Sequence, residues 1–464
     1  MLDIGLAVSI NYATRTVYKN VLVPSNPTDG PNGATMKTRA LLAGGLAAGV
    51  SLALAGCTPP DDSPGSAPTS LTMWHNSADS PALLQMYKDF EDETGIAIEL
   101  VDVPSDSFET TTLTKWATSD RPDLLEFHPT IANMLTLNPA QNMQDLSDMD
   151  FVAASGDLYE SMGSLDGKVY AAVTGFPSIF GIYYNKAVFA DNGLEPPRSF
   201  DDLADLCATL APSGIAPIWE SGGSVWPTQV LPLLYVADHN TANEYGADVG
   251  ANKAALDDAD SPFLAGLDAY AELRDGGCFN ADATSATFED GLKAVYGGTA
   301  AMTALHSDTY ASLLADAGDS PEALDAAVGF VPVSSASPVA SWAGGPLGTY
   351  YAPKTGHTAK EKAARDFIAF ATGAGYQKLV DDGKSFPVIE TAKTPDGFSA
   401  LQLSFQAAYE HDSSIAFNSN VAGFGALATE TSKLLAGQTT PEDAARTVQA
   451  AVEQASMAAG LPGW

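Results

Sequence analysis

The side chains best suited to hold a small molecule lie in or next to five short segments, each of which follows an expected strand. The segments are 74–79, 127–129, 221–226, 306–308 and 342–345. In open parallel sheets, ligands bind beyond the carboxyl ends of the strands, so these loops are where a site is expected. The candidate contact residues are Trp74, His75, Asn76, Asp79, Phe127, His128, Glu220, Trp226, His306, Asp308, Trp342, Gly344 and Gly345.

These residue types suit the noncovalent recognition of an uncharged ligand that carries hydroxyl groups. Aromatic rings pack against C–H faces, and carboxylates accept charge-assisted hydrogen bonds from hydroxyls. None of the five segments contains Lys or Arg, which disfavours a phosphorylated or carboxylated ligand. Each candidate also has a purely structural alternative. A tryptophan at a strand end often caps the core, and a histidine is often an ordinary hydrogen-bonded residue.

The sequence offers no catalytic motif. The G-x-S-x-G nucleophile elbow and the dinucleotide-binding fingerprint are missing, and Gly383-Lys-Ser385 lacks the earlier glycine of a P-loop. Histidines in three of the segments raise a zinc hypothesis, but no H-x-x-H spacing supports it, so we expect no metal and no cofactor. Two alternatives to a binder of uncharged, hydroxylated ligands stay open. One is a secreted glycoside-processing enzyme, and the other is a protein of the same overall fold that binds a metal ion or a polyamine.

The formal net charge of −35 argues against a nucleic-acid partner, because phosphate backbones are bound by clustered Lys and Arg, and no such cluster occurs. The acidic surface does not identify the ligand, since it commonly reflects solubility.

The elements that must position the candidates alternate between strand and helix. Strands are expected at 70–75, 96–103 and 123–127, with helices at 81–94 and 108–118 between them, and this order predicts a mainly parallel sheet. Further strands are expected at 176–185, 300–305, 328–333 and 347–352. Helix-capping sequences begin at Ser199, Thr358 and Thr440.

The N-terminal region predicts export. Met36-Lys-Thr-Arg39 is basic, and residues 40–55 form an uncharged apolar run that is shorter than the ~20 residues of a membrane-spanning helix. Leu54-Ala-Gly-Cys57 resembles the lipobox of bacterial lipoproteins, which implies a diacylated Cys57 at the outer face of the cytoplasmic membrane. We expect residues 1–35 to be a mis-called start or a disordered tail, 36–56 a lipoprotein signal peptide, and 57–69 a flexible tether.

The two remaining cysteines, Cys207 and Cys278, form an even pair in a compartment where disulfides persist. They are either bridged or two buried thiols, and in both cases structural. The body beyond the tether, roughly 395 residues, exceeds what one hydrophobic core usually serves, so two domains are expected.

Several segments, in order and spacing, resemble the extracellular solute-binding proteins of family 1, which serve ABC importers of sugars and include maltose-binding protein. The segments are Leu71-Thr-Met-Trp-His75, Phe90-Glu-Asp-Glu-Thr-Gly-Ile96, Arg121-Pro-Asp-Leu-Leu125, Gly167-Lys-Val-Tyr170 with Ile182-Tyr-Tyr-Asn-Lys186, Gly297-Gly-Thr-Ala-Ala-Met302 and Trp342-Ala-Gly-Gly345.

This resemblance implies an α/β, type II periplasmic-binding-protein-like fold, in which hinge strands join two discontinuous lobes and the ligand lies in the cleft between them. We expect lobe 1 at 70–178 and 297–344, and lobe 2 at 179–296 and 345–464. The implied function is extracytoplasmic capture of a neutral sugar or oligosaccharide by a monomeric, non-enzymatic lipoprotein that delivers it to an ABC transporter permease.

Overall fold

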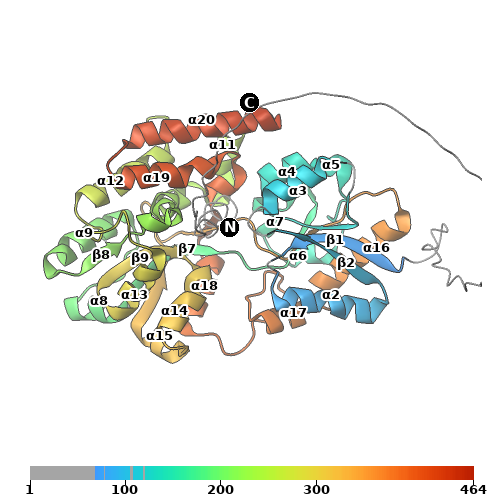
Figure 1. The fold of residues 1–464 in the computed structure, drawn as a ribbon, viewed down its shortest axis with the longest axis horizontal. Coiled ribbons are helices and arrows are strands. Elements are labelled where there is room, and N and C mark those ends of the chain that lie inside the picture. Colours follow the sequence, from blue (N-terminus) through green and yellow to red (C-terminus); the bar gives the residue numbers. More distant parts are fainter. Residues whose placement is uncertain (1–67, 78, 105–107, 119–120) are drawn as a thin grey trace, which may run out of the picture.

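The computed structural model describes residues 68–77, 79–104, 108–118 and 121–464 (Figure 1). The expected signal peptide, Cys57 and most of the expected tether lie outside the described residues. Within the described ranges, no helix combines the length and the apolar character that crossing a membrane requires.

The first lobe is built around a five-stranded sheet of order β2-β1-β3-β12-β6, in which β1 runs parallel to β2 and β3. β12 is antiparallel to its neighbours β3 and β6. The elements of this lobe are β1 (Ser70–Asn76), α2 (Pro81–Thr94), β2 (Ala97–Val103), α3 (Phe108–Trp116), β3 (Leu124–Glu126), α4 (Ile131–Leu137), α5 (Pro139–Asn142), α6 (Asp150–Ala153), α7 (Leu158–Ser161), β4 (Ser164–Leu165), β5 (Lys168–Val169), β6 (Ala171–Val173), β12 (Thr349–Tyr351), α16 (Thr358–Thr372) and α17 (Tyr376–Gly383).

The second lobe lies beside the first and contains a six-stranded sheet of order β13-β11-β7-β9-β8, with β10 also paired to β7 (Figure 1). Its strands are β7 (Ile179–Asn185), β8 (Ala216–Trp219), β9 (Ala300–His306), β10 (Val328–Val331), β11 (Ala340–Trp342) and β13 (Ser413–Ile415). Its α-helices are α8 (Lys186–Asn192), α9 (Phe200–Leu210), α10 (Val230–Tyr235), α11 (Glu244–Gly250), α12 (Pro262–Asp275), α13 (Phe288–Gly297), α14 (Tyr310–Asp316), α15 (Pro321–Ala327), α18 (Ala400–Glu410), α19 (Leu427–Leu435) and α20 (Pro441–Ala459).

Helix α2 shows how local sequence sets an element that borders the site. The Ser80 hydroxyl accepts a hydrogen bond from the N–H of Leu83, and Pro81 occupies the first helical position, where its missing N–H costs nothing. Gly95 ends the helix in the left-handed conformation, with φ of 73°. The buried face of α2 includes Tyr87 and Phe90, which fixes the helix against the first sheet.

The strand pairing corrects the expected lobe boundaries. Residues 297–344 were expected in lobe 1, but β9, β10 and β11 from this range pair in the second sheet. Conversely, β12 belongs to the first sheet, and α16 and α17 pack against α2. The physical reason is that β9 is a buried strand inserted between β7 and β8, so the chain stays in the second lobe until β11 ends.

The chain passes between the two lobes at residues 174–178, from β6 to β7, at 343–348, from β11 to β12, and at 384–399, from α17 to α18. We call the first two of these the crossing segments. They are held together by Thr174, whose N–H and hydroxyl both donate to the Gly348 carbonyl, at 3.0 and 2.6 Å.

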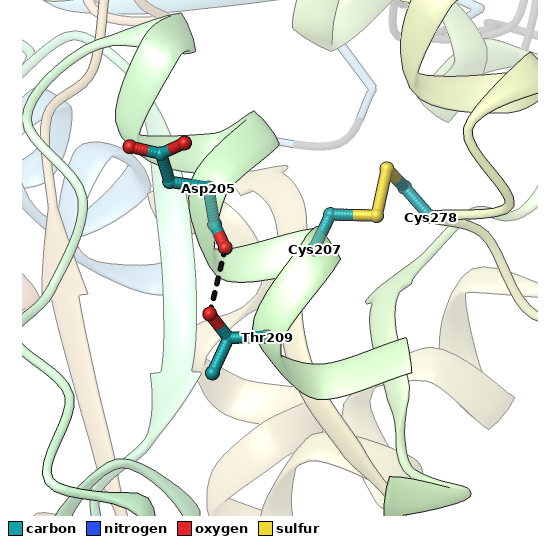
Figure 2. Close-up of a disulfide and its surroundings, with 4 residues drawn as sticks. All are labelled: Asp205, Cys207, Thr209 and Cys278. Carbon is teal, nitrogen blue, oxygen red and sulfur yellow. Dashed lines mark hydrogen bonds between the residues drawn. A yellow bond between two sulfur atoms is a disulfide. The ribbon is translucent and has the colours of Figure 1, made fainter. Parts of the chain in front are cut away.

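Cys207 and Cys278 form a disulfide in the structure, which is the first of the two alternatives that the sequence left open (Figure 2). Cys207 lies on α9, and the Cys278 carbonyl accepts a hydrogen bond of 2.9 Å from the N–H of Ile218 in β8. The bridge therefore fixes a covering helix of the second lobe to an outer strand of its sheet.

Candidate ligand-binding cleft

A cavity of ≈ 270 Å³ lies where the chain crosses between the lobes. It is lined by Ser80, Ala82, Leu83, Thr174, Gly175, Phe176, Ser178, Asp308, Ala343, Gly345, Pro346, Leu347, Leu379, Gly383 and Ser385. Helix α2 with its cap Ser80, helix α17 and Ser385 just beyond it contribute from the first lobe, Asp308 contributes from the second, and the crossing segments supply the rest. A ligand in this cavity would contact both lobes at once.

Phe176 provides the aromatic surface of the cavity. Its ring is half-buried and packs edge-on against Phe386 and Tyr409, with ring centroids 5.1 and 5.0 Å apart. Tyr409 in turn packs against Trp342, at 5.7 Å. Trp342, a predicted contact residue, is itself buried and absent from the lining, so it supports Tyr409 and does not face the cavity.

Asp308 provides the carboxylate of the cavity. The Ser178 hydroxyl donates to Asp308 Oδ2, and the N–H of Ile179 donates to the Ser307 hydroxyl at 3.0 Å. These bonds fix the first crossing segment to the end of β9. The Asp308 side chain is still 33% exposed, so it is able to accept further hydrogen bonds.

Trp226 and His306 pack against each other near Asp308, with ring centroids 4.8 Å apart. The His306 Nδ1 atom lies 3.9 Å from Asp308 Oδ2. Burial lowers the pKa of His306, which keeps the ring neutral. The second lobe therefore brings together three candidates, Trp226, His306 and Asp308. Of these, only Asp308 lines the cavity.

The predicted first-lobe contacts lie elsewhere. Trp74 and Phe127 belong to a hydrophobic core on the first sheet, and the Lys115 ammonium lies 4.2 Å from the Trp74 ring centroid. The His128 ring stacks on Phe127, with centroids 5.9 Å apart. The structural alternative thus describes these side chains better than a place in the cavity.

His75, Asn76 and Asp79 surround Glu126, the buried last residue of β3. His75 Nδ1 lies 2.9 Å from Asp79 Oδ2. His75, Asp79 and Glu126 are the one group among the described residues with the composition and spacing to hold a metal ion. His128 and His306 are not part of it, so the three-histidine hypothesis has no support here.

Glu220 is buried inside the second lobe rather than in the cavity. Its Oε1 atom accepts the Ser221 N–H at 2.7 Å, and its own N–H donates to Asn280 Oδ1. Burial raises the pKa of Glu220 to about 7, against the opposing effect of the Ser221 N–H and of Tyr270.

Gly345 lines the cavity, and its neighbour Gly344 is required by close packing, because a Cβ there would lie 2.4 Å from Ile415 Cδ1. Sequence reasoning missed most of the lining, including Ser80, Phe176 and Ser385. Two sequence features could have indicated these residues. One is the Ser-Pro helix start at 80–81, and the other is the Gly-Phe-Pro-Ser stretch at 175–178, which separates two apolar strands.

Comparison with known proteins agrees with this geometry. The profile of the family described as "Bacterial extracellular solute-binding protein" matches residues 74–378. The "Multiple sugar-binding protein" of Streptococcus mutans serotype c is 24% identical over 168 residues, which are 35% of this chain and only 39% of that relative.

Solved structures share the fold. A structure titled "Chitin oligosaccharide binding protein" aligns with a TM-score of 0.66 at 21% identity, over 84% of this chain and 99% of that chain. "SBP RafE in complex with raffinose" aligns with a TM-score of 0.62 at 20% identity, over 83% and 99%. The predicted two-lobed fold and family are confirmed, and because the family profile covers well over half of the sequence, the chain belongs to the bacterial extracellular solute-binding proteins.

Proposed function

We propose that this protein captures a neutral sugar or short oligosaccharide outside the cytoplasm and delivers it to the permease of an ABC importer. The observation that carries this proposal is the cavity between the lobes, which presents the Phe176 ring, the Asp308 carboxylate and several hydroxyls on one small surface. The names of the similar proteins, a multiple sugar-binding protein and a complex with raffinose, support the same ligand class.

The lining matches the chemistry of a sugar. The Phe176 ring packs against the C–H face of a pyranose, and Asp308 accepts hydrogen bonds from its hydroxyls. Ser80 and Ser385 offer hydroxyls from the first lobe, and Asp308 belongs to the second. No Lys or Arg occurs among the described lining residues, so a phosphorylated or carboxylated ligand would find no cation there.

We propose that the protein binds the sugar without cleaving it. The described lining contains one carboxylate, Asp308, whereas most glycoside hydrolases use two carboxyl groups that flank the scissile bond. The alternative of a glycoside-processing enzyme would require a second acid from outside this lining.

Release to a permease requires two states of the binding protein. A sugar that contacts both lobes binds the closed state more tightly than the open state and so shifts the population toward closure. We further propose that the protein is a monomer and that acylated Cys57 holds it at the membrane surface, with residues 57–69 as a tether.

The first test is a thermal-shift screen of the purified protein against neutral mono- and oligosaccharides, followed by calorimetric titration and chromatography of the sugar. A sugar at 100 times its Kd should stabilise the fold by about 2.7 kcal/mol. The recovered sugar should be chemically unchanged. The proposal would be overturned if no sugar raised the Tm while a polyamine did. It would also be overturned if chromatography showed a cleaved product.

Asp308→Asn tests the site itself. Loss of the charged acceptor should weaken sugar binding by roughly tenfold or more, since a hydrogen bond to a charged group contributes about 1.5–3 kcal/mol. The control is Asp257→Asn, which changes an exposed acid of the same lobe. Equal affinities of the two variants would remove Asp308 from the site.

A further inference from the structure

The strongest unassigned feature is a group of three buried side chains that borders the cavity lining through Ser80, the residue after Asp79. His75 from the end of β1, Asp79 from the following loop and Glu126 from the end of β3 each place a ligand atom within 4.8 Å of the other two. No second group of this kind occurs among the described residues. The neighbours of this group in the chain, Ser80 beside Asp79 and Leu125 beside Glu126, belong respectively to the cavity lining and to the core.

The three side chains are buried and held in fixed orientations. Glu126 is fully buried, and its two oxygens accept backbone N–H groups, from Asn76 at 2.9 Å and from Gly348 at 2.8 Å. The Tyr87 hydroxyl donates to Asp79 Oδ2 at 3.0 Å. Such outer contacts are what position the ligands of a metal before the ion arrives.

One oxygen of this group lacks any partner. The Asp79 side chain is 1% exposed, and its Oδ1 atom accepts no hydrogen bond. A buried carboxylate oxygen without a donor or cation is costly. The buried, unpartnered Asp79 Oδ1 atom therefore leaves a position at which a cation could be bound.

We propose that His75, Asp79 and Glu126 bind a divalent transition-metal ion of the Zn²⁺ or Mn²⁺ type. One imidazole nitrogen with two carboxylates is a ligand set for such ions, whereas Ca²⁺ and Mg²⁺ prefer oxygen alone. His75 supplies Nδ1, because its Nε2 atom lies 2.8 Å from Asp102 Oδ1. A carboxylate on the second ring nitrogen is the usual outer contact of a metal-bound histidine.

One spacing within the group, between His75 and Asp79, fits adjacent positions around one ion. Two ligand atoms that are each about 2.1 Å from a metal and at right angles to each other lie about 3.0 Å apart. The distance of 2.9 Å between His75 Nδ1 and Asp79 Oδ2 agrees with this value. Metal binding would replace that contact and release the proton that it holds. The bound ion would join β1 and β3 and, through the Gly348 N–H on Glu126, the second crossing segment.

The experiment uses the full chain without an affinity tag. The metal content is measured by mass spectrometry after dialysis, and Zn²⁺ and Mn²⁺ are then titrated into chelator-treated protein by calorimetry and thermal shift. We expect one ion per chain and a rise in Tm on adding the metal, reversed by EDTA. His75→Gln and Glu126→Gln should abolish binding, and His239→Gln, which changes an exposed histidine of the second lobe, should retain it.

Asp102→Asn keeps the test decisive if the buried variants do not fold. Asp102 is largely exposed, with 78% of its side chain accessible, so its replacement should preserve the fold while weakening metal affinity 10- to 100-fold. The proposal is overturned if neither ion binds at millimolar concentration, in which case Asp79 and Glu126 share a proton. It is also overturned if the ion persists in His75→Gln and Glu126→Gln, which would place it elsewhere. Neither outcome depends on sugar binding, which is measured separately on the same samples.

Discussion

At the scale of single residues, Glu220 is a buried acid whose pKa has been raised to about 7 by burial. Between the ordinary glutamate value of 4.5 and this value, the unfolded chain has released the proton and the folded chain retains it. The folded state thus binds more protons, and through this residue the free energy of unfolding decreases by up to about 3 kcal/mol as the pH rises through that window.

Glu220→Gln should remove this dependence, because the amide keeps an oxygen for the Ser221 N–H but carries no charge. We expect the variant to gain stability relative to the wild type as the pH rises from 5 to 8, by up to about 3 kcal/mol. Urea denaturation at several pH values measures the difference, with the exposed Glu195→Gln as control. A constant difference across these pH values would contradict the assignment.

Val225 occupies a strained backbone conformation immediately before Trp226, with φ of 64° and ψ of −64°. A β-branched residue pays about 1–3 kcal/mol for such a conformation, which glycine adopts freely. Its carbonyl accepts hydrogen bonds from the N–H and the hydroxyl of Thr228, at 3.2 and 2.8 Å, and these hold the turn in place.

Val225→Gly should therefore leave the protein as stable as the wild type or more stable by about 1 kcal/mol, in spite of the flexibility that glycine adds to the unfolded chain. The matched control is Val331→Gly, a half-buried valine in β10, which should lose about 1 kcal/mol or more. Chemical denaturation compares the two. Equal losses would show that Val225 carries no strain.

Single residues of the site were the hardest to predict from sequence. Asp308 and Gly345 were predicted and line the cavity, whereas Trp74 and Phe127 were predicted and lie in the core. Residue type and position after a strand cannot tell which way a side chain points, because this depends on helices that pack from distant parts of the chain. Glu126 was overlooked for the same reason, since it sits inside an apolar strand and its partners come from β1 and from Gly348.

At the scale of elements, the crossing segments depend on Gly175. A Cβ at this position would lie 2.2 Å from the Leu347 carbonyl oxygen, which is backbone and cannot move aside without shifting the other segment. Gly175→Ala should push the segments apart, weaken the Thr174 to Gly348 bonds and destabilise the protein by about 2 kcal/mol or more. It should also weaken sugar binding, because both segments line the cavity.

The control is Gly297→Ala, near the end of α13, where an added Cβ meets nothing within 4 Å. Denaturation and sugar titration of both variants separate a specific close approach from a general effect of alanine. If Gly175→Ala had the stability and the sugar affinity of the wild type, the two crossing segments would not pack as tightly as described.

Elements governed by local signals were predicted well. Helix α2 has its expected limits, and Thr440 accepts the Asp443 N–H to open α20, as predicted. At α16 the predicted cap was displaced by one residue. The helix begins at Thr358 rather than after it, and the Glu361 carboxylate accepts the N–H groups of Thr355 and Gly356. The Glu361 carboxylate is therefore occupied by the preceding turn and does not form a capping box with Thr358.

At the scale of the whole molecule, sequence predicted two lobes but not their division, since strand order is set by pairing between distant segments. β9 pairs with β7 across more than a hundred residues, and no local pattern in the chain encodes that choice. The resulting arrangement places the cavity between lobes that also touch where α4 packs against η8 (Phe417–Asn420). A ligand that contacted both lobes in this cavity would therefore be coupled to their separation.

This coupling yields a prediction for the intact protein. Saturating sugar should reduce the radius of gyration measured by small-angle X-ray scattering, because the ligand favours the closed state through its contacts on both lobes. A change from 1% to 99% closed requires about 10⁴-fold tighter binding to the closed state. Asp308→Asn removes a second-lobe contact, so at saturation it should close less fully than the wild type, while Asp257→Asn should close equally. If the wild-type radius stays constant at saturation, the sugar binds without moving the lobes, and the proposed delivery to a permease would need some other signal.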